Sequence, residues 1–221
     1  MTLVLVENET VLVRLYGYPT VQNGAGDIAI FRKSRALELL VWLALHKERP
    51  RRSAARTALW EFAVSDATFS TVFSDMRRAL QELAPRNSSS DWFKPTYTDA
   101  ISMDTDLVTD AELLSRCFSA FKEDSSRWEP LADVLFTIRD APFAGTEFSW
   151  ADLDGTTTRL TILAIEASAS LARWAQSVGD STLALRATSA GLKVLPGCEE
   201  LLKIEQSFLP SVSSSRLRRT G

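Results

Sequence analysis

The chain contains 221 residues, of which 45% are hydrophobic and 24% are charged, and its formal net charge is -3. This length can form one large hydrophobic core or two small ones, and we expect two. No apolar run approaches the roughly 20 residues that a transmembrane helix needs, and the first residues lack the basic leader and cleavage site of a secretory signal. We therefore expect a cytoplasmic protein without a membrane segment.

Cysteine and histidine, which are common metal ligands and catalytic residues, are scarce. Cys117 and Cys198 are far apart and His46 is the only histidine, so we predict no zinc site, no disulfide framework and no histidine-based triad. We interpret both cysteines as small buried apolar residues and His46 as a cation or cap at a helix C-terminus. No glycine-rich phosphate loop or Gly-x-Ser-x-Gly motif is present, so we predict a protein that is not an enzyme and needs no cofactor or metal.

Charge is distributed unevenly along the chain. Residues 1–105 carry 13 basic and 12 acidic side chains, whereas residues 106–221 carry 12 basic and 16 acidic ones. Within the first half, the segment from Arg32 to Arg56 holds eight basic residues against two acidic ones. A local excess of this kind suits a polyanionic partner such as DNA.

The first part of the chain predicts a small antiparallel sheet followed by helices. Residues 11–16 alternate in polarity and residues 28–30 follow a turn-rich segment, so we expect both to be strands. Residues 34–45 are apolar almost all the way round, which predicts a buried helix that stops before Pro50. A short helix fits residues 53–62, with Ser53 as its N-cap. Its packed side would consist of Ala54, Ala55, Ala58, Leu59 and Phe62.

The third helix, over residues 66–83, is clearly amphipathic. We expect Ser65 or Asp66 to cap its start. Its apolar positions are spaced three and four residues apart: Phe69, Val72, Phe73, Met76, Leu80 and Leu83. We expect Phe69 and Phe73 to share one core with Trp42 and Trp60. The opposite face carries Thr71, Ser74 and Arg78, with Ser70, Arg77 and Gln81 on one flank and Asp75 on the other.

A hairpin predicted from residues 92–94 and 97–103 completes an order of elements typical of a winged helix-turn-helix. In that fold the third helix enters the DNA major groove, while the hairpin reaches the adjacent backbone. We therefore predict DNA contacts from the polar face of the third helix, through Thr71, Ser74, Arg78, Arg77 and Ser70. Phosphate contacts are predicted from Arg51, Arg52 and Arg56 in the basic segment and from Lys94 in the hairpin.

After Asp106 the pattern is helical. We expect helices over residues 108–122, 128–139, 150–178, 181–194 and 198–208. The small residues and closing proline of residues 172–196 are typical of a tetratricopeptide (TPR) unit. One interpretation is therefore a TPR-like interaction domain, and the other is a plain helical bundle that supports the first domain.

Charge and periodicity both change near residue 105, which predicts a first domain over residues 1–105 and a helical domain over residues 106–209. Near this boundary, Asp104, Asp106 and Asp110 are too loosely spaced for a calcium loop. We expect them to face solvent and to cap the next helix. Residues 210–221 are expected to form a disordered tail.

Several segments, taken in order, resemble the SARP family of actinobacterial transcriptional activators. Residues 35–46, 49–50, 58–60 and 76–80 resemble its OmpR-type winged helix. The second half resembles the family's bacterial transcriptional activation domain (BTAD) at residues 140–145, 148–150, 171–172, 179–180 and 192–196. The resemblance implies a transcriptional regulator that binds double-stranded promoter DNA at direct repeats. It also implies a helical domain that dimerises and contacts protein partners such as the transcription machinery.

Two departures from the family pattern lead to a second hypothesis. The third helix contains no basic residue from Thr68 to Asp75, and Asp75 is expected to repel phosphate, so DNA binding is expected to be weak. The segment from Ser211 to Gly221 also replaces further helices of the family, so the chain resembles a shortened form or a fragment of a longer protein. The alternative function is a protein-interaction or signalling adaptor with a vestigial winged helix.

Overall fold

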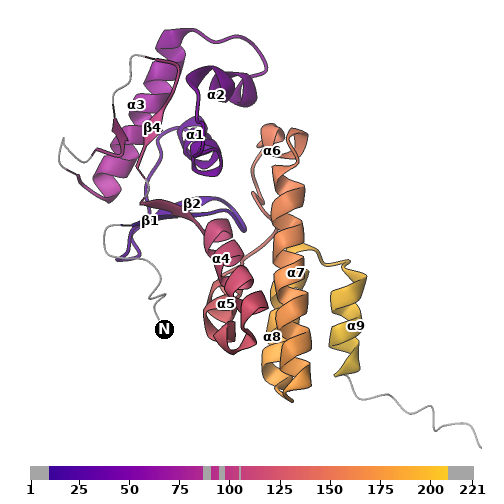
Figure 1. Ribbon diagram of the computed structural model, residues 1–221. Coiled ribbons are helices and arrows are strands. Elements are labelled where there is room, and N and C mark those ends of the chain that lie inside the picture. The colour runs from indigo at the N-terminus through magenta and orange to yellow at the C-terminus, as the bar shows by residue number, and fades with distance from the viewer. Residues whose placement is uncertain (1–9, 87–90, 95–97, 105, 209–221) are drawn as a thin grey trace, which may run out of the picture.

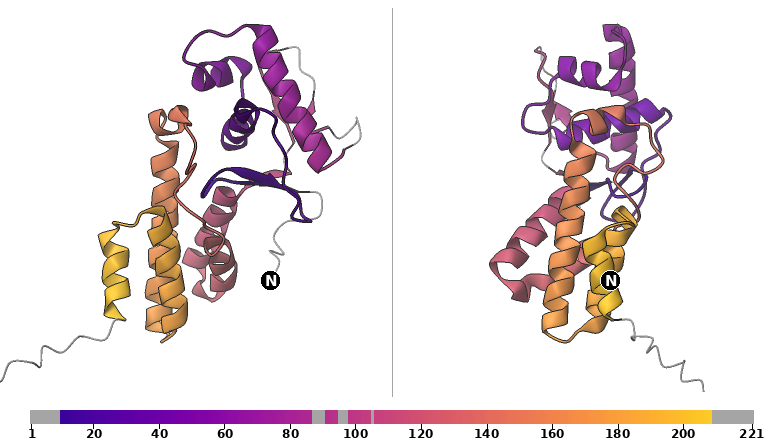
Figure 2. Two further views of the ribbon diagram at one scale, coloured as in Figure 1. Left: turned by 180° about the vertical axis from the view of Figure 1, so that it is seen from behind. Right: turned by 90° about the vertical axis from the view of Figure 1, so that its right-hand side faces the viewer.

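The computed structural model describes residues 10–86, 91–94, 98–104 and 106–208 (Figure 1). The helices of residues 34–83 lie at one end of the molecule, and most of the helices of residues 110–207 form the other end (Figures 1 and 2). The helix of residues 149–153 reaches back beside the helix of residues 34–45, where Trp150 contacts the His46 ring. The small β-sheets lie among and beside the helices of residues 34–83. The expected mainly helical fold with small sheets is confirmed. The predicted tail at residues 210–221 lies outside the described residues.

The larger sheet contains β2 (Thr20–Gln22), β1 (Val11–Arg14) and β5 (Leu107–Thr109), in that order. β1 pairs antiparallel with β2 and parallel with β5. The strand predicted at residues 28–30 is wrong, because only Ile28 forms an isolated bridge, with Gln22. Ile28 is 58% exposed and Ile30 is 82% exposed, so neither packs on a covered sheet face.

Helix α1 (Ser34–Leu45) and helix α3 (Asp66–Leu83) have the predicted bounds. α1 is buried nearly all round, in agreement with its continuous apolar sequence. His46 is its C-cap, as expected, and the His46 ring stacks on the Trp42 ring with 4.2 Å between centroids. The predicted cap of α3 is also confirmed, because the Ser65 hydroxyl accepts the backbone N–H of Thr68 at 3.1 Å.

Helix α2 (Arg52–Leu59) is shorter than predicted and begins differently. Ser53 is not its N-cap, because the helix begins at Arg52 and Arg51 holds the N-cap position. The Ser53 hydroxyl instead donates to the carboxylate of Asp99 at 2.5 Å. The helix ends at Leu59, so Phe62 lies in the following loop and is 82% exposed rather than packed. Ala54 is exposed as well.

The aromatic core predicted for the first half is confirmed. The rings of Trp60, Phe69, Phe73 and Phe93 form a chain with successive centroid distances of 6.1, 6.0 and 5.2 Å. Trp42 belongs to the same hydrophobic cluster. Burying an aromatic ring of this size stabilises a fold by about 2 kcal/mol, so this cluster is a main attachment of α3. All six predicted apolar positions of α3 are buried: Phe69, Val72, Phe73, Met76, Leu80 and Leu83.

The predicted hairpin is present as an antiparallel pair of short strands, β3 (Phe93–Lys94) and β4 (Ser102–Met103). Residues 95–97, which fall within the predicted hairpin, lie outside the described residues. Phe93 points into the aromatic core against Phe73, whereas Lys94 is exposed. Because successive side chains of a strand point to opposite faces, one face of this strand pair packs against α3 and the other faces solvent.

In the helical end, the structure differs from the prediction mainly in where the helices begin and end. Its helices are α4 (Asp110–Glu123), α5 (Trp128–Leu135), α6 (Ser149–Leu153), α7 (Thr156–Ser177), α8 (Ser181–Val194) and α9 (Glu199–Ser207). The single helix predicted over residues 150–178 is wrong, because Gly155 adopts a φ of 76° and separates α6 from α7. Both cysteines, expected to be buried, are only partly buried, and both are free thiols.

Asp110 does not face solvent as predicted. Its side chain is buried and accepts the backbone N–H groups of Leu15 and Tyr16. Thr109, not Asp110, caps α4, in a capping box with Glu112. The other two aspartates of the group, Asp104 and Asp106, form ion pairs with Arg86. A domain boundary near residue 105 stays a prediction.

Candidate nucleic-acid interface

The polar face of α3, which we define as Ser70, Thr71, Ser74, Arg77 and Arg78, is exposed along its whole length. The structure therefore brings together the five α3 residues that the sequence predicts as DNA contacts. The opposite face of the same helix packs into the aromatic core, so the polar face cannot rotate inward without exposing buried rings. The Thr71 hydroxyl donates to the carbonyl of Ala67 at 2.9 Å. Its oxygen still has room to accept a further hydrogen bond.

The start of α3 is tied to α2 by Arg56. The Arg56 guanidinium pairs with Asp66 in the first turn of α3 and donates to the backbone carbonyl of Val64. Asp66 is also placed favourably for the positive end of the α3 dipole. Arg56, predicted to contact phosphate, therefore serves in this structure to hold the α2–α3 connection.

Asp75 lies beside the polar face and is neutralised within the protein. Its carboxylate is 3.2 Å from the ammonium of Lys33 and 3.6 Å from the guanidinium of Arg78. The Asp75 side chain is only 14% exposed. The sequence predicts repulsion of DNA by Asp75, but these two cations compensate its charge, which weakens that repulsion.

Arg77 and Arg78 both have carboxylate partners. Arg77 pairs with Asp91, just before β3, and Arg78 pairs with Asp75 on its own helix. Both guanidinium groups are nearly half exposed, at 44% and 49%. Pairs at this exposure contribute little to stability, so phosphate or base oxygens can compete with the carboxylates at small cost.

The start of α2 is joined to the segment before β4 by Asp99. Its carboxylate accepts both the hydroxyl and the backbone N–H of Ser53, at 2.5 and 2.8 Å. These hydrogen bonds hold the pKa of the Asp99 carboxyl below its usual range, with Arg51 and Arg52 adding a smaller attraction. The predicted phosphate contacts Arg51 and Arg52 thus sit at a fixed junction between α2 and the β3–β4 pair.

Contacts with Phe73 place two further predicted phosphate contacts, Arg52 and Lys94, relative to α3. The Arg52 guanidinium lies 5.3 Å from the centroid of the Phe73 ring, and the Phe93 ring packs against the same side chain. Lys94 follows Phe93 and is exposed. Arg52 and the strand that carries Lys94 are therefore both placed next to α3, as a shared binding surface requires.

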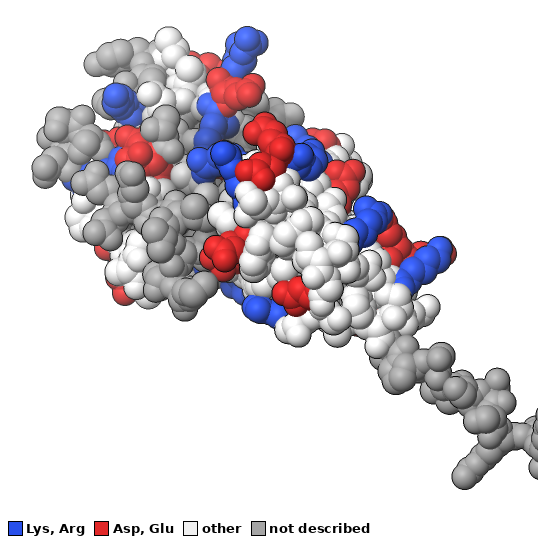
Figure 3. Space-filling model, turned by 60° about the horizontal axis from the view of Figure 1, so that its bottom comes forward, with Lys and Arg blue, Asp and Glu red and all other residues white. Residues whose placement is uncertain are grey.

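Half of the eight basic residues from Arg32 to Arg56 have acidic partners. Lys33, Arg35, Lys47 and Arg56 pair in turn with carboxylates of Asp75, Glu38, Glu112 and Asp66. Among the described residues, no ion pair reaches Arg32, Arg49 or Arg51, and all three are exposed. Figure 3 shows a different face, toward the bottom of the view in Figure 1, where acidic and basic side chains are also interspersed. The sequence excess of six positive charges thus overstates the free charge of this region.

Sequence reasoning missed two residues that shape the interface, Lys33 and Asp99. Each acts on a partner distant in the sequence, Lys33 on Asp75 and Asp99 on Ser53. No local pattern signals such pairs, because the chain must fold before the partners meet. The sequence marks Lys33 only as one member of the basic segment from Arg32 to Arg56, and Asp99 only as part of the predicted hairpin.

No described helix has the length and apolar character needed to cross a bilayer. Among the described residues, the side chains of His, Cys, Asp and Glu form no group of three or more that could hold a metal ion. Comparison of the sequence with protein-family models and with curated proteins finds no match to either.

Proposed function

We propose that the chain is a transcriptional regulator that binds double-stranded DNA through a winged helix-turn-helix formed by its first half. In this proposal α3 enters the major groove with its polar face toward the bases. The observation that carries the proposal is the division of α3 into one wholly exposed polar face and one wholly buried apolar face. Serine and threonine hydroxyls and arginine guanidinium groups are suitable readers of base edges, with arginine favouring guanine.

The neighbouring elements support this arrangement with phosphate anchors. Arg51 and Arg52 lie at the start of α2, and Lys94 lies on β3, which packs on α3 through Phe93. In a winged helix-turn-helix, the hairpin and the helix before the third one contact the DNA backbone on either side of the recognition helix. The SARP-like segments of the sequence agree with this function. We further propose that the helical end dimerises or binds a protein partner.

The proposal is tested by measuring duplex affinity as a function of salt for the full chain and two single variants. Arg78→Ala should weaken binding to the preferred sequence by about 1–3 kcal/mol, because a base contact is lost. Lys94→Ala should weaken binding to all duplexes alike and should lower the salt slope by about one, because a phosphate contact is lost. Equal effects of both variants on all sequences would contradict base reading by α3.

The second candidate is an adaptor that binds protein and no longer binds DNA. The observation in its favour is the engagement of basic side chains: Lys33, Arg56, Arg77 and Arg78 all pair with carboxylates. Each engaged cation is one fewer immediately available for phosphate, and DNA affinity depends on the number of phosphates neutralised. Absence of any duplex binding at low salt, where electrostatic attraction is strongest, would favour the adaptor over the regulator.

A further inference from the structure

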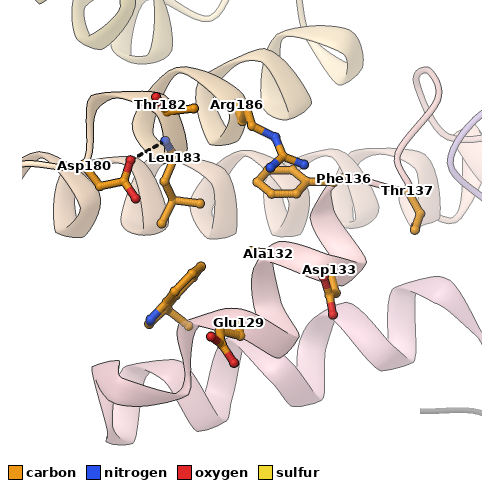
Figure 4. A pocket seen from close by; sticks show the side chains of 10 residues that line it. Glu129, Ala132, Asp133, Phe136, Thr137, Asp180, Thr182, Leu183 and Arg186 are labelled. Atoms are coloured by element: carbon orange, nitrogen blue, oxygen red, sulfur yellow. Dashed lines mark hydrogen bonds between the residues drawn. The ribbon is translucent and has the colours of Figure 1, made fainter. Parts of the chain in front are cut away.

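A groove of about 690 Å³ runs between α5 and α8 at the helical end (Figure 4). Its apolar floor is made by Trp128, Ala132 and Phe136 from α5 and the residue after it, and by Leu183 from α8. Trp128 and Phe136 are partly exposed. A volume of this size is within the range of sites that bind small ligands.

The rim of this α5–α8 groove is acidic. Glu129 and Asp133 are exposed on successive turns of α5, and Asp180 lies at the start of α8, where its carboxylate accepts the Leu183 N–H at 2.9 Å. Arg186 is the one basic residue of the lining, and its guanidinium lies over the Phe136 ring at 3.9 Å. Within the described residues, no ion pair reaches Glu129 or Asp133. Three carboxylates against one guanidinium favour a cationic occupant.

The described chain ends at the same end of the helical bundle as Asp180. The side chain of Gln176, near the end of α7, donates to the hydroxyl of Ser207, the last residue of α9, at 2.9 Å. Asp180 follows Gln176 by four residues, across the turn that joins α7 to α8. Figures 1 and 2 show the end of α9 and the turn between α7 and α8 at this common end. The segment that follows α9 therefore starts level with the Asp180 end of the groove, on the other side of α7 and α8 from α5 (Figure 1).

That segment has the charge that the groove lacks. It carries Arg216, Arg218 and Arg219 around Leu217, and it contains no acidic residue after Phe208. Its 13 residues can extend over about 40 Å. The 14 residues of α8 span about 21 Å, so the segment is long enough to reach and follow the groove.

We propose that the α5–α8 groove binds an arginine-rich peptide segment, and that its occupant is residues 211–221 of this chain. The arginines pair with Glu129 and Asp133, and Leu217 lies on the apolar floor. This inference concerns the helical end and does not depend on DNA binding.

The experiment uses a fluorescein-labelled synthetic peptide with the sequence of residues 211–221, titrated into full-length proteins at low and high salt. One protein is the unchanged chain, and the other carries Arg216→Gln, Arg218→Gln and Arg219→Gln. The glutamine protein should bind the peptide, more weakly at high salt. The unchanged chain should bind it at least about tenfold more weakly, because its own segment competes at a high effective concentration.

Two further proteins locate the binding site in the glutamine background. Glu129→Gln with Asp133→Asn should reduce peptide affinity about tenfold or more, and these nearly isosteric changes at exposed positions should leave the unfolding temperature unchanged. Glu82→Gln with Glu166→Gln is the matched control, because both carboxylates are exposed and lie outside the groove lining, and it should bind like the parent.

Three outcomes would overturn the proposal. The first is no peptide binding by the glutamine protein, and the second is equal binding by it and the unchanged chain. The third is equal affinity of the groove variant and its control. If the arginine substitutions instead lower duplex affinity while the groove substitutions leave peptide binding unchanged, the basic segment contacts DNA and the groove is not its site.

Discussion

The carboxylate of Asp110, at the start of α4, accepts the backbone N–H of Leu15 at 2.9 and 3.0 Å, across 95 residues of sequence. The same carboxylate accepts the N–H of Tyr16 at 3.3 Å. Burial raises the pKa of Asp110 to about 6, against the opposing effect of these N–H groups and of Arg14. One buried ionisable group thus lies at the join between the first sheet and the helical end.

Asp110 should make the free energy of unfolding depend on pH. Its carboxyl keeps its proton in the folded state up to about pH 6, whereas in the unfolded chain it loses it near its ordinary value of 3.8. Its contribution is therefore fully present below about pH 4 and is lost as pH rises through 6, by up to about 3 kcal/mol. Urea unfolding of the native chain and of Asp110→Asn between pH 4 and pH 7 measures this. A difference between the two proteins that does not change with pH would contradict it.

Asp75→Asn should strengthen non-specific DNA binding. The change removes the carboxylate that holds Lys33 and Arg78, so both cations become available to phosphate. Affinity for random duplex DNA should rise, and the salt slope should steepen by about one to two. Glu166→Gln, an exposed change in the middle of α7, is the control and should leave both quantities unaltered. Unchanged affinity in Asp75→Asn would argue that α3 does not face DNA.

Phe73→Ala should destabilise the first half strongly. Phe73 is 9% exposed and contacts the rings of Phe69 and Phe93 as well as the Arg52 guanidinium. Loss of a buried ring and the cavity it leaves should lower the free energy of unfolding by about 3–5 kcal/mol, measured by urea unfolding. Phe62→Ala, at a side chain that is 82% exposed, should cost far less. Similar losses in both variants would place the buried face of α3 in doubt.

Gly191→Ala should loosen the packing of α7, α8 and α9. An added Cβ at Gly191 would lie 2.5 Å from Cδ1 of Leu201 on α9 and 2.8 Å from Cβ of Ser168 on α7. Relieving these contacts should cost about 1–3 kcal/mol, more than the gain in helix propensity from alanine. Thermal unfolding tests this, with Gly197→Ala as control, because nothing lies within 4 Å of its added Cβ. A melting temperature at or above that of the native chain would show that the three helices can separate freely here.

Sequence reasoning succeeded where a local signal agreed with the final packing. α3 was predicted with its observed bounds because its apolar period is regular and Ser65 supplies a cap. The five residues of its polar face followed from the same period. The exposure of those residues is established, whereas their role in DNA binding stays a prediction.

The failures fall where tertiary structure decides the outcome. β5 was missed because Leu107–Thr109 continues into the pattern of α4 and forms a strand only by pairing with β1. The break at Gly155 was missed because Leu153 and Leu160 are seven residues apart, a spacing that also fits one continuous helix, and a left-handed backbone at one position leaves no periodic trace. The pairing of Lys33 with Asp75 was missed because it joins separate elements.

The position of β1 between β2 and β5 means that the chain passes from one end of the molecule to the other inside a hydrogen-bonded sheet. A piece of the protein ending at residue 105 would leave one edge of β1 unpaired, and such edges readily pair with other chains and aggregate. Independent production of the first half therefore requires Leu107–Thr109. β5 also leads directly into α4 and pairs with β1. A partner protein that displaces α4 therefore also displaces β1, so a force on the helical end is transmitted directly to the sheet.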